Sequence, residues 1–328
     1  MKYSIINILK SNKDKFTSGE AISAKLGVTR ASIWKYMKAL KEEGYLIESA
    51  PKKGYKLISS PDLLTYEETK EYLNTKYIGR TIDHFDSLFS SNDKAKEFAN
   101  MNAKEGTVVV CEKQTSGKGR LGRKWVSPKC KGIWMSIILR PDINTIDVPK
   151  ITQIAAASVQ KTLIDIGVDS YIKWPNDIIV NKKKVCGILT EMSGEINRVN
   201  YVIVGIGLNA NLDLDDFHSN LSETATSLKI EYQKSFKRNL ILANILNNFE
   251  NLYEDLITEN NIEKSIDICR KYSILIGKQV RVINSRKTKK AEALDLNHKG
   301  QLIVKFEDGT ISPIISGEIS IRGLNGYV

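Results

Sequence analysis

The stretch best suited to chemistry is glycine-rich and cationic: residues 114–125, Gln-Thr-Ser-Gly-Lys-Gly-Arg-Leu-Gly-Arg-Lys-Trp. It lies between two apolar runs typical of strands, so we predict a long loop. Its glycines let backbone N–H groups approach a ligand, and four cations fall within seven residues: Lys118, Arg120, Arg123 and Lys124. Such a loop suits a phosphate chain or a carboxylate, although a solvated basic loop is equally consistent with these residues. No Gly-Lys-Ser/Thr closes the stretch, so it is not a Walker loop.

A second motif, Lys173-Trp-Pro-Asn-Asp177, follows a short β-prone run. Pro175 ends that strand, and the next two residues favour a turn. An ordinary strand-ending turn explains the pattern, but a lysine, an indole and a carboxylate at a strand end also suit a nucleotide. A hairpin is predicted next, and its second strand begins at Lys184.

Together these motifs, with the Lys-x-x-Gly-Ile-Leu that starts at Lys184, resemble the hallmarks of the biotin–protein ligases. The resemblance extends from about Tyr66 to the C-terminus. In that family the loop reads Gly-Arg-Gly-Arg-x-Gly-Arg-x-Trp, so Lys118 replaces an arginine and lacks its planar fork. With the N-terminal segment included, the chain resembles the bifunctional bacterial enzymes that are also repressors of the biotin operon.

The resemblance implies a two-step reaction. Biotin's carboxylate attacks the α-phosphate of ATP, with Mg²⁺ on the phosphates, and a lysine of biotin carboxyl carrier protein then attacks the resulting biotinyl-5′-AMP. Lys184 and Arg120 are the predicted catalytic residues. The predicted biotin-binding residues are Ser90, Ser91, Asn92, Gln114, Lys118, Gly119, Arg120 and Lys184, with residues 118–120 acting through their backbone. The predicted adenylate-binding residues are Trp125, Lys173, Asn176, Asp177 and Asn209.

For several of these residues, the sequence allows more than one role. Trp125 either packs against adenine or covers the closed loop, and Asp177 places either Mg²⁺ or a ligand hydroxyl. Residues 90–93 also read as a helix cap, whatever else they bind. Besides Lys118, three positions depart from the family pattern: Ser91 stands for a threonine, Phe89 for a frequent aspartate and Cys130 for a glycine.

The N-terminal sixty residues carry most of the net charge of +11, with eleven lysines and one arginine against five acids. Their pattern predicts three helices and then two short strands joined by a turn at Pro51–Gly54, which is a winged helix. A cationic outer face and wing tip favour DNA over a protein partner. The predicted DNA contacts are Arg30, Lys35, Lys38, Lys52 and Lys53.

The predicted fold class is α+β in three domains. Residues 1–60 form the winged helix, Ser59–Asp62 a linker, residues 66–275 a mixed α/β catalytic domain of the biotin/lipoate ligase type, and residues 276–328 a small SH3-like β-barrel. The barrel is either a stabilising appendage or a contact for the protein substrate. Residues 200–208 are expected to be an apolar strand that ends in a close-approach turn at Gly205–Asn209, and residues 193–200 a polar loop.

The composition excludes several classes of function. Four scattered cysteines and three scattered histidines show no metal-ligand or catalytic spacing. No apolar run approaches 18 residues, so a membrane span is not expected, and the cytoplasm is the default location. We expect the partners to be the carrier protein, operator DNA and a second copy of the chain when ligand is bound, with biotinyl-5′-AMP as co-repressor. Four alternatives remain: a ligase with an uncoupled or vestigial DNA-binding domain, a biotin sensor without catalysis, a constitutive dimer, and a lipoate-type ligase.

Overall fold

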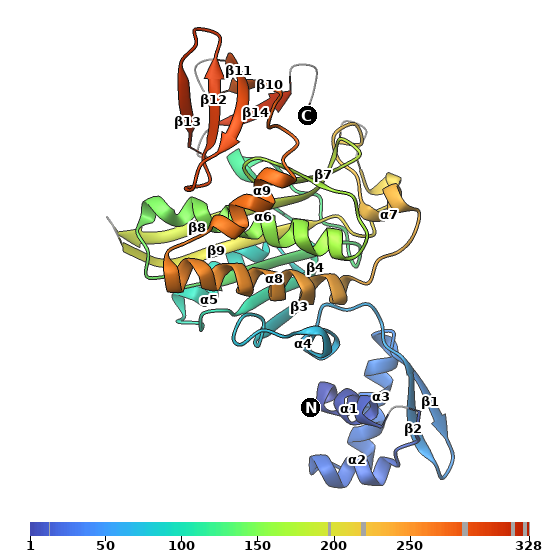
Figure 1. Ribbon diagram of the computed structural model, residues 1–328. Helices are drawn as coiled ribbons and strands as arrows, with labels where there is room; N and C mark the ends of the chain where they lie inside the picture. Colours follow the sequence, from blue (N-terminus) through green and yellow to red (C-terminus); the bar gives the residue numbers. More distant parts are fainter. Residues whose placement is uncertain are drawn as a thin grey trace.

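The computed structural model describes residues 1–12, 14–195, 198–217, 221–283, 288–315 and 319–323, together with Tyr327. A small helical part, a large α/β part and a β-rich part follow one another along the chain (Figure 1). The helical part and the β-rich part lie at opposite ends of the α/β part. The predicted α+β class is confirmed.

The N-terminal part is a winged helix, as predicted. Ser18 and Thr29 cap its second and third helices by accepting backbone N–H groups. Ile33, Met37 and Leu40 are buried on the inner side of the third helix, at the helical spacing read from the sequence. The elements are α1 (Lys2–Ser11), α2 (Gly19–Leu26), α3 (Arg30–Glu42), β1 (Leu46–Ala50) and β2 (Gly54–Ser59).

The segment after the wing is held at two points. Asp62 accepts hydrogen bonds from the backbone N–H and from Nε of Arg238, both at 3.0 Å. Glu68 is buried and binds the winged helix, because it accepts from Nζ of Lys10 at 2.7 Å and from Oη of Tyr45 at 3.0 Å. Charge-assisted bonds of this kind restrict how the winged helix sits on the central part.

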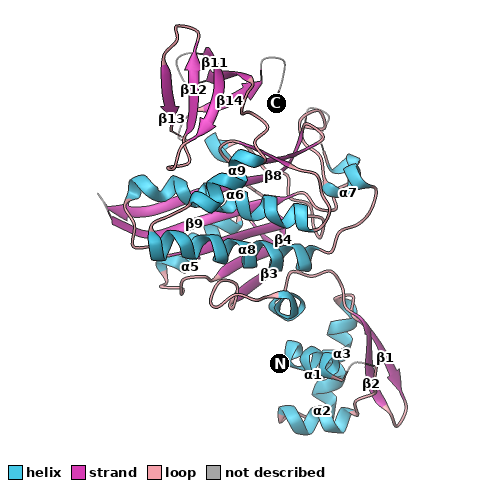
Figure 2. Ribbon diagram, in the orientation of Figure 1, coloured by secondary structure: helices cyan, strands magenta, loops and turns pink. Residues whose placement is uncertain are grey.

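A seven-stranded sheet in the order β3-β4-β5-β9-β8-β7-β6 organises the central part (Figure 2). β3 and β4 are parallel, and every other neighbouring pair is antiparallel. The strands are β3 (Ile82–Leu88), β4 (Val108–Gln114), β5 (Ile133–Leu139), β6 (Tyr171–Lys173), β7 (Asp177–Val180), β8 (Lys183–Glu195) and β9 (Arg198–Leu208).

Helices cover the two faces of this sheet unequally. Val108 and Val110 of β4 face the large core beneath the long helices α6 and α8, whereas Val109 faces Ala95 of α5 on the opposite side. In the described part of the chain, the second face is covered by α5 and, through Ile230, by the short helix α7, and it leaves room between them. The helices are α4 (Tyr66–Thr69), α5 (Ser91–Asn100), α6 (Val148–Asp165), α7 (Leu228–Tyr232), α8 (Arg238–Glu259) and α9 (Glu263–Lys271), and the 3₁₀ turns are η1 (Lys70–Tyr72), η2 (Arg120–Gly122), η3 (Thr145–Asp147) and η4 (Leu214–Asp216).

The C-terminal part is a five-stranded antiparallel sheet in the order β13-β12-β11-β10-β14. Trp174 of the central part joins it, because the indole Nε1 donates to the backbone oxygen of Gly300 at 2.9 Å. This tryptophan is buried and also belongs to the large core of the central part. The strands are β10 (Gln279–Ile283), β11 (Thr288–Leu296), β12 (Leu302–Phe306), β13 (Ile311–Ile314) and β14 (Ser320–Gly323).

Two local expectations were wrong. The strand predicted over residues 200–208 is confirmed, but it does not end in a turn at Gly205–Asn209, since residues up to Leu208 belong to β9. Residues 193–200 are not a simple loop, because β8 runs to Glu195 and β9 starts at Arg198; residues 196–197 lie outside the described part. Pairing between the two strands supplies backbone hydrogen bonds that the polar side chains did not signal. Across the described residues, no helix is long and apolar enough to cross a membrane.

Candidate ligand-binding and catalytic site

A cavity of about 220 Å³ opens beside α5 on the less covered face of the sheet. Its walls come from the start of α5, the glycine-rich loop, the Lys173–Asp177 motif, the facing parts of β8 and β9, and β14 of the C-terminal sheet. Every predicted biotin- or adenylate-binding residue lines it. Segments far apart in the sequence therefore meet at one site.

One end of the cavity is lined by uncharged side chains that hydrogen bonds hold in place. The backbone N–H of Ser91 donates to Oε1 of Gln114 at 2.8 Å, and Oγ of Ser136 donates to Oδ1 of Asn92 at 2.6 Å. Asn92 in turn donates to Oε2 of Glu191 at 2.7 Å. Buried amides and hydroxyls held in this way keep fixed orientations, which suits recognition of a small polar ligand.

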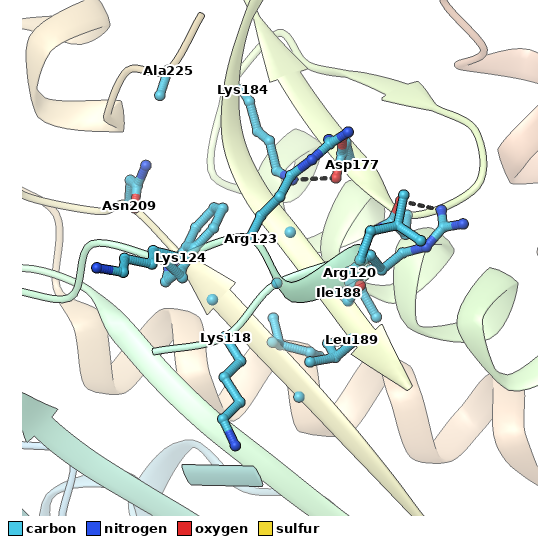
Figure 3. Close-up of a pocket in the computed structure, with 18 of the residues that line it drawn as sticks. Lys118, Arg120, Arg123, Lys124, Asp177, Lys184, Ile188, Leu189, Asn209 and Ala225 are labelled. Atoms are coloured by element: carbon cyan, nitrogen blue, oxygen red, sulfur yellow. Dashed lines mark hydrogen bonds and ion pairs between the residues drawn. The ribbon is translucent and has the colours of Figure 1, made fainter. Parts of the chain in front are cut away.

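The glycine-rich loop folds back on itself. The Gly119 N–H donates to the oxygen of Arg123 at 2.7 Å, and the Trp125 N–H donates to the oxygen of Gly117 at 2.9 Å. In Figure 3 the Lys118 side chain extends away from the Lys184–Asp177 pair. Its ammonium binds Asp93 at 2.7 Å, and this hydrogen bond raises the pKa of Lys118. The predicted contact of Lys118 with biotin is therefore left to its backbone.

The indole of Trp125 lines the cavity and packs against β8 and β9. A Cβ added to Gly207 would stand 2.6 Å from the indole Nε1, and one added to Gly187 would stand 3.1 Å from the indole ring. A side chain at Gly207 would displace the indole, and one at Gly187 would meet Lys184 at 2.9 Å as well as the indole, which explains two glycines on neighbouring strands. Nε1 is buried and has no hydrogen-bond partner among the described residues. A buried donor without a partner suits a ligand acceptor.

The Lys173–Asp177 motif and Lys184 form a charged group at the other end of the cavity. Lys184 makes an ion pair with Asp177, and Figure 3 shows Arg123 extending toward the same pair. Lys173 is buried, and burial lowers its pKa to about 7. Asp177 opposes that shift, whereas Lys184 adds to it.

Arg120 joins the loop to two other parts of the chain. Its guanidinium donates from Nη1 to Oδ1 of Asn176 at 3.0 Å and from Nη2 to the backbone oxygen of Ile319 at 3.2 Å. Burial lowers the pKa of Arg120, and the nearby Asp177 opposes the shift. Because the guanidinium is already partly desolvated, binding an anion costs it less further loss of water.

Asn209 lies at the end of β9, and its side chain is fixed from one side. Nδ2 donates to the oxygen of Thr226 at 3.0 Å, while Oδ1 is buried without a partner in the described residues. An amide oxygen held in this way can accept from an exocyclic amine. Ala225 lies next to it in the cavity wall (Figure 3).

Three parts of the site were missed from the sequence. Ser136 lies inside an apolar strand, so nothing marked it as a hydrogen-bond partner of Asn92. Arg322 and Tyr327 belong to the C-terminal part, which was read as a separate unit.

Among the described residues that line the cavity, Asp177 is the only acid, and no cluster of three or more metal-ligating side chains occurs in the described part of the chain.

The predicted DNA-binding residues lie on one end of the molecule, away from the cavity. Arg30, Lys35 and Lys38 are exposed on α3, and Lys52 and Lys53 are exposed at the wing tip. Sequence reasoning also missed Trp34. This indole is 60% exposed on α3 between the cations, whereas the apolar side chains on the inner side of the helix are buried.

Comparisons with known proteins agree with this arrangement. Residues 2–56 match an HTH domain, residues 85–209 the biotin/lipoate A/B protein ligase family and residues 275–322 the biotin protein ligase C terminal domain. Over 322 residues the chain is 38% identical to the bifunctional ligase/repressor BirA of Bacillus spizizenii, with 98% of each chain covered. Identity to BirA of Escherichia coli K12 is 26% over 313 residues, with 94% of each chain covered.

Similarity to a solved structure points the same way. The biotin protein ligase of Aquifex aeolicus, solved in complex with biotin and ATP, matches 74% of this chain and 99% of its own with a TM-score of 0.65 and 28% identity. A central sheet with this cavity, completed by a C-terminal β-sheet, defines a biotin protein ligase. The winged helix and the similarity along the whole chain specify the group further: this protein belongs to the family of the bifunctional ligase/repressors BirA.

Proposed function

We propose that this protein is an ATP-dependent biotin–protein ligase that also binds operator DNA as a biotin-responsive repressor. The observation that carries the enzymatic half is the division of one cavity into a neutral end and a cationic end. Biotin has a neutral ureido ring and a carboxylate, and ATP brings a polyanion. A site with these two ends aligns the carboxylate of one substrate with the phosphates of the other.

At the neutral end, Asn92, Gln114 and the residues beside them hold biotin. Ser90 caps α5 and Ser91 donates its N–H to Gln114, so both position the start of that helix. The backbone of residues 118–120 covers the ligand from the loop. Trp125 offers its free Nε1–H and ring face to the adenylate, and Asn209 offers Oδ1 to the adenine amine.

At the cationic end, the positive charges of Lys184, Arg120 and Lys173 offset the negative charge of the biotin carboxylate and the ATP phosphates. A carboxylate oxygen of biotin bonds to the α-phosphorus, the bond to the β-phosphate oxygen breaks, and pyrophosphate leaves. In the second step a neutral lysine amine of the carrier attacks the acyl carbon, AMP leaves with the mixed-anhydride oxygen, and the amine loses a proton. Neither step needs a nucleophile from the enzyme, so preorganised cations are the main contribution of the chain.

The Asp177 carboxylate fits a metal that arrives bound to the phosphates of its substrate, because those phosphates offset the charge of the surrounding cations. Mg²⁺ commonly takes one or two protein carboxylates and completes its shell with phosphates and water. Asp177 is the acid that would hold it, with Asn176 alongside. The ion would neutralise charge on the phosphates.

Biotin-dependent exchange of pyrophosphate into ATP tests the first step. Exchange that requires biotin, followed by transfer of label to the lysine of a carrier domain, is the expected result. Exchange that follows lipoate instead of biotin would identify a lipoate-type ligase. Biotin binding without any exchange would identify a sensor without catalysis.

The repressor half requires two winged helices on one operator. A single short module contacts few base pairs, whereas two copies related by a twofold axis gain roughly 10²–10⁴ in avidity. We propose that bound biotinyl-5′-AMP orders the cavity loops and thereby favours a homodimer, so dimerisation must in turn tighten ligand binding. Sedimentation with and without biotin plus ATP measures this coupling. An unchanged association state together with unchanged operator affinity would leave a ligase with an uncoupled DNA-binding arm.

The proposed division into domains is residues 1–60, 66–275 and 276–328. Asp62 binds Arg238, so a shortened chain should keep it. Residues 62–328 alone are expected to biotinylate the carrier and to lose DNA binding. A folded fragment without ligase activity would show that the winged helix is part of the catalytic unit.

A further inference from the structure

Tyr327 lies inside the charged end of the cavity, although it belongs to the last residues of the chain. Its hydroxyl donates a hydrogen bond to the Asp177 carboxylate. Its ring faces the ammonium of Lys173, with 3.3 Å between Nζ and the ring centroid. The matched C-terminal family segment ends at residue 322, so this tyrosine lies beyond the region that the family comparison covers.

The two partners of Tyr327 are the residues that we assign to the nucleotide. Lys173 is 4% exposed, and the other charged groups that face it are Asp177, Lys184, Arg322 and Arg123. A buried ammonium among other cations needs a compensating group. The aromatic face and the Asp177 carboxylate supply it while no phosphate is bound.

A phosphate chain cannot share this space with a phenol ring. ATP brings negative oxygens to Lys173 and a metal ion to Asp177, and each of these interactions replaces one that Tyr327 makes. We propose that Tyr327 is a further residue of the nucleotide subsite: it holds the place of the phosphates in the ligand-free protein, and ATP must displace it. This inference rests on the proposed function for the location of the ATP site, and it adds a competition within the chain.

Competition of this kind has a measurable signature. When the binding-competent state is only part of the population, the apparent dissociation constant rises by the inverse of that fraction. Removing the ring should therefore tighten ATP binding by about three- to tenfold. Affinity for biotin, which binds at the neutral end, should not change.

The test compares Tyr327→Ala and Tyr327→Phe in the full-length chain. Direct equilibrium binding of Mg²⁺ with a non-hydrolysable ATP analogue is the main measurement, and ATP–pyrophosphate exchange gives KM and kcat. We expect Tyr327→Ala to lower the dissociation constant and the KM for ATP without changing kcat. The phenylalanine variant keeps the ring and loses only the Asp177 bond, so its affinity should fall between those of the wild type and the alanine variant. Ile311→Ala, an exposed change on β13, is the matched control.

Removal of the ring should also rehydrate Lys173. The pH at which ATP binding weakens should therefore move upward in Tyr327→Ala, a shift that a purely structural role would not produce. Weaker or unchanged ATP binding in that variant, with unchanged thermal stability, would overturn the proposal and make Tyr327 a support for Asp177. The analogue measures binding without turnover, so the two proposals can fail separately. If Tyr327→Ala tightens ATP binding but the wild type shows no biotin-dependent exchange, the ligase assignment is wrong and the competition by Tyr327 stands.

Discussion

The guanidinium of Arg120 donates a hydrogen bond from Nη2 to the backbone oxygen of Ile319, at 3.2 Å, and thereby joins the glycine-rich loop to the C-terminal part of the chain. The same side chain reaches Oδ1 of Asn176 at 3.0 Å. Closure of the loop over a ligand is therefore linked to the position of the C-terminal sheet. The sheet's contribution to the cavity favours a role in ligand binding over that of a remote stabilising appendage.

Arg120→Gly is expected to release the adenylate. Charge-assisted hydrogen bonds contribute about 1.5–3 kcal/mol each, so loss of one should raise the adenylate off-rate by roughly 10- to 100-fold. The measurement is labelling of bystander lysines on an unrelated protein, together with the off-rate of biotinyl-5′-AMP. Lys129→Ala, which removes a surface cation outside the loop, should behave as wild type. Equal labelling by the two variants would remove the retention role from Arg120.

Lys184→Ala is expected to nearly abolish formation of the adenylate while the protein stays folded. Loss of a preorganised cation at the developing charge costs about 3–4 kcal/mol, or at least a hundredfold in rate. The matched control is Lys183→Ala on the same strand, where the ammonium binds the backbone oxygen of Ser222. Wild-type pyrophosphate exchange in Lys184→Ala would take this residue out of the mechanism.

The pH dependence of kcat/KM for ATP should follow the loss of charge on Lys173. Burial lowers its pKa to about 7, so the charged form is present below that pH and is lost as the pH rises. Because kcat/KM reports the free enzyme, kcat/KM for ATP should fall by about tenfold per pH unit above neutrality. Lys173→Arg keeps its charge, so its profile should stay flat between about pH 7 and 9. A falling profile in both proteins would assign the titration to another group.

The sequence was informative where local chemistry decides structure. Ser18 and Thr29 are helix caps, and the motifs around Arg120 and Lys173 converge on one cavity as their resemblance to a family implied. Such features depend on neighbours along the chain or on motifs whose types and order are specific. The strand β14 was not predicted, because a short polar segment becomes a strand only through pairing with β10.

Contacts between residues far apart in the sequence could not be predicted before the fold was known. Tyr327 reads as a terminal residue, yet it meets Asp177, and Ser136 reads as a small polar interruption of an apolar strand, yet it orients Asn92. Gly205 and Gly207 did signal close approach, but to side chains packed on a strand and not to a turn. Periodicity shows which face is buried and does not show what lies against it.

Glu112 gives the protein a predicted sensitivity to acid. Burial alone would raise its pKa, but hydrogen bonds from His84 and Arg238 outweigh burial and lower the pKa of Glu112 to about 2. Its stabilising contribution is complete above the unfolded-state pKa near 4.5 and is lost as the pH falls toward 2. Glu112→Gln should cost roughly 1.5–3 kcal/mol at pH 7, because the buried Arg238 loses one of its two carboxylate partners and keeps Asp62.

Urea unfolding midpoints at pH 7 and at pH 3 measure this effect. The wild type should lose much more stability between the two values than Glu112→Gln does. Glu307→Gln, which changes an exposed carboxylate of the C-terminal part, should follow the wild type. Parallel losses in wild type and Glu112→Gln would show that other carboxylates determine the acid transition.

The winged helix should divide its DNA contacts between phosphates and bases. Lys52 and Lys53 at the wing tip are exposed ammonium groups that suit phosphates, so replacing either with glutamine should lower the slope of log affinity against log salt by about 1. Trp34 carries no charge and is exposed on the helix that enters the major groove in such modules. Its indole suits contact with thymine methyl groups. Trp34→Ala should therefore leave the salt slope unchanged and reduce the free-energy difference between specific and non-specific binding by roughly 1–3 kcal/mol. Titration of a selected operator and of scrambled DNA at several salt concentrations separates the two effects. Equal loss on both DNAs in Trp34→Ala would place the indole outside the base-reading surface, and an unchanged salt slope in both lysine variants would remove the wing from the phosphate contacts.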